Sequence, residues 1–172
     1  MNKNTLSNQI DSALIRAANS EQRLTFLCPH HRDWVYFHSQ DALAHLDQIQ
    51  IKGEILLEHR KWREALPFVG CAWETAEILL QLYSGEKTFL VNRLCCLTVL
   101  LNRCLDKNGH KACAEQVCRQ TQSVLTLALH QLDQSSGQHS YLMFCIEQLK
   151  HPERFQVYLS PLAGGGESNA LH

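Results

Sequence analysis

The sequence has no excess of charge of either sign. Its 172 residues include 16 Lys and Arg against 17 Asp and Glu, and neither end of the chain concentrates one sign. Proteins that bind nucleic acids or anionic membranes through charge typically carry a basic patch or tail. The balance argues against both classes of partner, so we expect the protein to bind neither nucleic acid nor a membrane.

Proline and glycine are also scarce. The chain has 4 Pro and 8 Gly but 27 Leu. A composition rich in strong helix formers and poor in turn residues favours long helices over turn-rich sheets. The hydrophobic content of 45% suffices for a folded core. We therefore expect an all-α fold with a single domain over residues 1–160 and a flexible tail over residues 161–172.

Long apolar runs are absent as well. The two longest stretches without a charged residue, 120–132 and 134–146, are interrupted by polar residues and are shorter than the roughly 20 residues that span a bilayer. Residues 1–19 lack the basic-then-apolar pattern of a secretion signal. We therefore expect a cytoplasmic protein whose 8 cysteines are reduced, buried thiols.

Apolar residues recur at steps of three and four along most of the chain, which predicts helices. The expected ranges are 6–18, 39–57 with Ser39 as the cap, 63–82, 86–107, 111–131, 140–149 and 153–159. The segment from Leu24 to Phe37 has no clear period, and Pro29 forbids a continuous helix there. We interpret it as a helix end or turn that leads into the next helix.

Residues 53–72 carry a repeat-like pattern of small and apolar side chains. The pattern consists of Gly53, Leu56, Trp62, Ala65, Val69 and Ala72. This segment resembles a tetratricopeptide (TPR) repeat. Glycine and alanine allow two paired helices to approach closely, and the aromatic residue fills the space at their turn. A weaker echo lies 49 residues later, where only the helix-turn-helix outline and Ala114 survive. The resemblance implies antiparallel helical hairpins stacked as a short TPR-like superhelix.

Sequence motifs of catalysis are missing. The chain has no GxGxxG, P-loop, HExxH or GxSxG pattern, so we expect no enzyme and no cofactor. The TPR resemblance implies instead a noncatalytic adaptor or chaperone that binds a protein or peptide segment in the groove lined by the first helices of the hairpins. The polar residues expected to contact the partner are Glu54, Asn92, Arg93 and Arg103. A type III secretion chaperone is a related interpretation, although the offset of the echo differs from that of the standard repeat.

Two other interpretations stay open. Cys28, His30 and His31 are potential metal ligands within four residues, which suggests a metal- or cofactor-responsive regulator as the alternative function. Turn histidines beside a buried thiol are the simpler explanation. The aromatic stretch from Trp34 to Phe37 fits a buried core position better than a contact between two copies in a homodimer.

Overall fold

The computed structural model describes residues 23–83, 87–133 and 136–152. The helices expected over residues 6–18 and 153–159 and the tail expected over residues 161–172 lie outside the described residues. Within the described part, every regular element is an α-helix. The expected all-α fold is confirmed.

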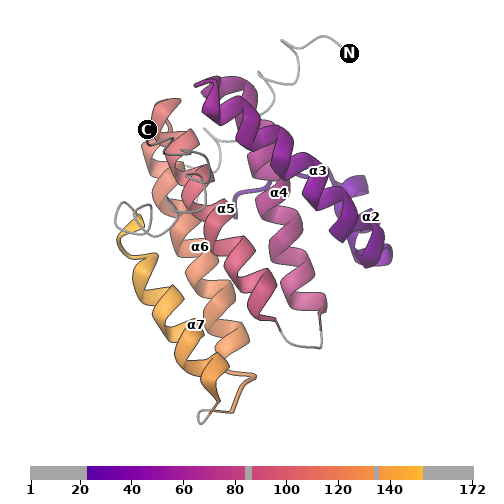
Figure 1. Cartoon of the computed structure of the whole chain (residues 1–172), viewed down its shortest axis with the longest axis vertical. Helices are drawn as coiled ribbons and strands as arrows, with labels where there is room; N and C mark the ends of the chain where they lie inside the picture. The colour runs from indigo at the N-terminus through magenta and orange to yellow at the C-terminus, as the bar shows by residue number, and fades with distance from the viewer. Residues whose placement is uncertain (1–22, 84–86, 134–135, 153–172) are drawn as a thin grey trace, which may run out of the picture.

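Six helices make up the described chain. They are α2 (Pro29–Phe37), α3 (Ser39–Glu58), α4 (Trp62–Leu82), α5 (Thr88–Lys107), α6 (Lys111–Leu129) and α7 (Gly137–Gln148). From α3 onward each helix packs against the next, and consecutive helices run in opposite directions (Figure 1). The long helices begin and end within about three residues of the expected positions, as the leucine period predicts.

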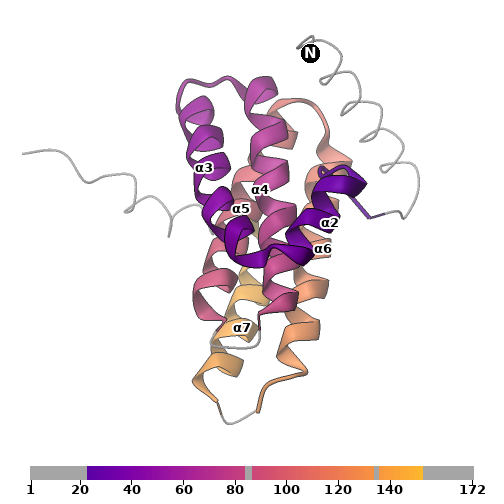
Figure 2. The same cartoon turned by 90° about the vertical axis from the view of Figure 1, so that its right-hand side faces the viewer.

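The helices alternate between two sides of the molecule. Helices α4 and α6 contact each other, and so do α5 and α7. Side-chain bonds from α5 reach α3. The chain therefore zigzags between a layer of α3, α5 and α7 and a layer of α4 and α6, while the short α2 packs across α3 and α4 (Figure 2).

Small residues set the spacing of α3 and α4, as the sequence predicts. A Cβ atom placed on Gly53 would lie 2.8 Å from a methyl carbon of Val69, and Ala65 is fully buried. Gly109, which follows the α5 terminus, has a φ of +82°, a left-handed conformation that is common for glycine just after a helix. Pro67 lies inside α4, beyond the unpaired amides of its first turn.

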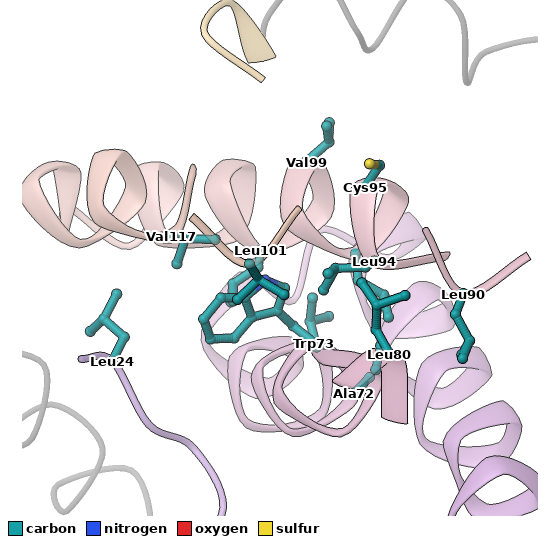
Figure 3. Close-up of a cluster of buried hydrophobic side chains, with 14 of the residues drawn as sticks. Leu24, Ala72, Trp73, Leu80, Leu90, Leu94, Cys95, Val99, Leu101 and Val117 are labelled. Carbon is teal, nitrogen blue, oxygen red and sulfur yellow. The ribbon is translucent and has the colours of Figure 1, made fainter. Parts of the chain in front are cut away.

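Helix α4 is the centre of the core and is buried on nearly every side over residues 65–80. The largest buried side chain, Trp73, packs against α5 and α6 among leucines and valines (Figure 3). Its indole Nε1 donates to Thr121 Oγ1 at 3.0 Å, and the Thr121 hydroxyl lies 2.8 Å from that of Thr98. This small polar network satisfies groups that would otherwise be costly to bury.

The segment from Leu24 to Phe37 differs from its expected form. Residues 23–28 are nonhelical, and helix α2 follows with Pro29 in its first turn, where a proline needs no amide partner. The cap residue of α3 is His38, and Ser39 is already helical. In the aromatic stretch Val35 is buried, but Phe37 is 82% exposed. The expected core position therefore holds for only part of the stretch.

Helix α5 is unusually apolar for its length, although the sequence predicts no membrane-spanning segment. By length and composition Thr88–Lys107 could cross a membrane. More than half of this segment, however, is buried inside the protein. Core helices of folded domains share these properties, so the finding is weak evidence for a membrane span.

Candidate functional site

Two of the four expected partner-binding residues meet between α3 and α5. The Arg93 guanidinium donates to Gln50 Oε1 at 2.7 Å and forms an ion pair with Asp47 at 2.5 Å. The Gln50 side-chain amide in turn donates to Glu54 Oε1 at 2.7 Å. Arg93 and Glu54 are thus joined through Gln50. We call Asp47, Gln50, Glu54 and Arg93 the α3–α5 polar chain.

Helix geometry explains this arrangement. Gln50 and Glu54 are one turn apart on α3 and lie on the same face, so the glutamine can bridge to the next helix. Arg93 is only 20% exposed, whereas Asp47 is 60% exposed. In the polar chain, Arg93 is therefore largely buried and fixed by its partners, whereas the Asp47 carboxylate is accessible to solvent.

Asn92, the third expected residue, lies toward the other side of α5. Its side-chain oxygen accepts a hydrogen bond from the hydroxyl of Tyr141 on α7. Helix α7 is therefore held beside α5, in the same layer as α3. Helices α3, α5 and α7 thus lie in one layer.

Thiols cluster next to this contact. Hydrogen bonds from Cys95 and Tyr141 lower the pKa of the Cys145 thiol to about 7, against the opposing effect of burial. Burial and the nearby Glu54 carboxylate raise the pKa of Cys96. Cys145 is fully buried, so no substrate touches it in this conformation. All eight cysteines are free, as expected, but Cys28 is exposed and Cys71 and Cys96 are only partly buried, so the expectation of buried thiols holds for the other five.

Arg103, the fourth expected residue, is separate from the polar chain. Its guanidinium carbon lies 5.4 Å from the centroid of the Trp62 ring, a cation–π contact at the turn between α3 and α4. Arg103 also lines a cleft of about 420 Å³ between the end of α5 and the start of α6. The other residues that line the cleft are Asn102, Asp106, Lys107, Lys111, Ala114, Glu115 and Pro152. The four expected residues therefore occupy three places on the surface.

The ligand-like cluster at the start of α2 is incomplete. Cys28 Sγ lies 3.0 Å from His31 Nδ1, and the rings of His30 and His31 are 6.0 Å apart. In the described ranges, no group of three or more His, Cys, Asp or Glu is placed to hold a metal ion. A structural zinc site commonly uses four such ligands, so the described residues supply too few at this position.

A second polar site, built on buried carboxylates of α4, was not predicted from the sequence. Glu74 and Glu77, on α4, are 1% and 0% exposed. Together with Gln120 of α6 they bind residues 23–28, which we call the N-terminal strap. Buried carboxylates need partners, and two of them in the otherwise uncharged run of residues 65–80 were the feature that could have revealed the site.

No protein-family model matches this sequence, and no curated protein or solved structure matches it significantly.

Proposed function

We propose that this chain is a noncatalytic cytoplasmic adaptor or chaperone, built as a TPR-like array, that binds a segment of another protein along α3, α5 and α7. The observation that carries the proposal is the α3–α5 polar chain. It aligns a guanidinium, an amide and two carboxylates along the junction of two first helices. Such pre-oriented groups recognise the polar atoms of an extended segment without paying again to order their own side chains.

Apolar groups lie beside the polar ones on α3. Ile51 and Ile55 are 55% and 49% exposed. They continue the row that begins at Asp47, because residues four apart on a helix lie on one face. A partner can therefore bury aliphatic surface against α3 while its carboxylate or carbonyl oxygens bind Arg93. Exposed apolar side chains next to oriented polar groups are typical of protein interfaces.

Affinity purification of the protein, expressed at its native abundance, tests the proposal. We expect a protein partner to copurify with the wild-type chain and to be lost with Arg93→Glu, which reverses the charge at the junction. Arg119→Glu is the matched control, since Arg119 is 65% exposed on α6 and pairs with Glu115 of the same helix. Circular dichroism must show that both variants keep the wild-type helix content.

Two results would contradict the proposal. One is the absence of any stoichiometric protein partner of the wild-type chain. The other is a partner that Arg93→Glu and Arg93→Gln leave fully bound, because the polar chain would then have no part in recognition.

A further inference from the structure

The N-terminal strap, residues 23–28, crosses α4 and α6 in the manner of a bound peptide. Leu24 is 1% exposed and points toward Val117 of α6 (Figure 3). Thr25 is exposed, and Phe26 is again half-buried against α4. Leu24 and Phe26 thus face the helices and Thr25 between them faces solvent, as in an extended chain. Leu27 is also partly buried against the core. The strap lies on the α4–α6 layer and leaves the α3–α5 polar chain untouched.

The helices bind the main chain of the strap directly. The Gln120 side-chain amide accepts from the Leu24 amide at 3.0 Å and donates to the Leu24 carbonyl at 3.3 Å. Glu74 Oε2 accepts from the amides of Phe26 and Leu27 at 2.5 and 2.8 Å. Main-chain contacts of this kind supply affinity for any extended segment, as in peptide recognition by strand addition.

Three side-chain positions of the strap are recognised individually. The Arg23 guanidinium pairs with the buried Glu77 carboxylate. Leu24 enters the core, and the Phe26 ring covers Gly70 and meets Trp73 edge-on with the ring centroids 6.1 Å apart. A Cβ on Gly70 would lie 2.2 Å from that ring, so the glycine makes room for it. The site therefore selects a basic residue, then an apolar residue, then an aromatic residue two positions later.

An empty site would be unfavourable. Glu74 and Glu77 are both buried, and their partners are Arg23, Arg32, Gln120 and main-chain amides of the strap. If the strap left, Glu74 would keep Arg32 and Glu77 would keep Gln120, but both would lose their remaining donors, and under-satisfied buried carboxylates are costly. Any replacement must bring both N–H donors and a cation.

We propose that the α4–α6 face is a second peptide-binding site, which the strap fills in cis and which also accepts an extended segment of a partner protein. The partner segment carries Arg or Lys, then Leu or a similar residue, then Phe two positions further on. The strap is its intramolecular competitor. This inference uses a different face from the proposed function, so either can fail alone.

Competition in cis sets the expected affinity. A tethered segment acts at an effective concentration on the order of millimolar. A free peptide therefore binds the wild-type chain weakly, and a substitution that weakens the strap strengthens the binding of the free peptide. Phe26→Ala in the full-length chain does this, because it removes the ring from Gly70 and Trp73.

The test is a fluorescence-anisotropy titration with a labelled peptide of residues 21–28 in which serine replaces Cys28. We expect the Phe26→Ala chain to bind this peptide at least about tenfold more tightly than the wild-type chain does, since it loses most of the cis competition. Adding Gln120→Ala to the Phe26→Ala chain is expected to weaken binding again by about tenfold, because two main-chain bonds are lost. A scrambled peptide is the matched control.

The proposal is overturned if a folded Phe26→Ala chain shows no saturable binding at millimolar peptide, or if it binds the scrambled peptide equally well. Arg23→Ala provides a second route if Phe26→Ala does not fold, because Arg23 is 48% exposed and its loss leaves the apolar contacts in place. Light scattering adds one more outcome. Dimers of the wild-type chain that dissociate on adding the peptide would identify the occupant as the strap of a second copy and would reject a partner protein.

Discussion

The α4–α6 face and the α3–α5 face differ in how deeply their charged side chains are buried. On the α4–α6 face, Glu74 and Glu77 are buried, and their partners come from distant parts of the chain. On the α3–α5 face, Asp47 and Arg93 remain in partial contact with water. Burial raises both the strength of an interaction and the cost of losing one of its partners. Loss of a contact is therefore expected to cost more stability on the first face, which the strap fills, than on the second, where the charged groups are partly open to solvent.

The largest effect is expected from Glu74→Ala. This change leaves Arg32 and two strap amides without their acceptor, and breaking such a buried pair costs about 3–5 kcal/mol. Urea denaturation followed by circular dichroism measures the free energy of unfolding. Glu54→Ala is the control on the other face, where the expected loss is below about 1 kcal/mol. Equal losses for the two variants would contradict the distinction between the faces.

Gly70→Ala is expected to come next. The new methyl group would overlap the Phe26 ring, and overpacking of this kind costs about 1–3 kcal/mol. Gly137→Ala at the start of α7 meets no atom within 4 Å, so its effect should stay within about 0.5 kcal/mol. In the double variant Gly70→Ala/Phe26→Ala the two losses should not add, because the clash has been removed. Additive losses would show that the strap does not rest on Gly70.

A smaller effect concerns pH and Glu77. Burial raises the pKa of this carboxyl above its usual 4.5, although Arg23 and Gln120 favour the ionised form. Between the usual and the raised pKa the folded chain binds more protons than the unfolded chain, so the contribution of Glu77 to stability falls as pH rises through that window. Glu77→Gln removes the carboxylate, so its stability relative to wild type should increase from about pH 4.5 to about pH 7. Thermal melts at both pH values measure this, and an opposite trend would show that the ion pair with Arg23 dominates.

The smallest effect is expected on the α3–α5 face. Asp47→Ala removes a rim carboxylate from Arg93, and an exposed pair of this kind contributes below about 1 kcal/mol. Raising the salt concentration should reduce the difference further, because exposed charges are screened. Lys61→Ala is a suitable reference, since its pair with Glu64 is 3.9 Å long and solvent-exposed. If Asp47→Ala lowered the free energy of unfolding as much as Glu74→Ala does, the proposed difference between the two faces would be wrong.

Much of the helical framework was predictable from the sequence. Leu90, Leu94, Leu97, Leu101 and Leu105 keep one face of α5 apolar over its whole length, and all five are buried. Such a sustained period determines both the type of element and its inner face. Gly53 and Ala65 likewise predict a close helix pair. The TPR-like stacking itself stays a prediction.

The strap and its site were not predictable, for a physical reason. Local periodicity describes how a segment meets the core, but it does not identify distant partners. The bonds of Leu24 to Gln120 join residues 96 positions apart, and those of Phe26 to Glu74 join residues 48 apart. Helix α2 was missed because its nine residues hold a single buried side chain, Val35. The link between Arg93 and Glu54 was not predictable either, because it depends on how α3 and α5 are aligned, which the sequence does not give.

The bonds between Leu24 and Gln120 also bear on how the chain folds as it is synthesised. Leu24 is synthesised early, but Gln120, whose side chain binds the Leu24 main chain, is synthesised 96 residues later. Until α6 has been synthesised, Glu77 lacks its Gln120 donor and the two carboxylates are less buried. A domain generally folds as a unit, so the contacts of the strap are complete only after α6 has been synthesised. The strap therefore precedes the helices in sequence, but a nascent chain halted before Gln120 would hold it through Glu74 and Glu77 without the two bonds to Leu24.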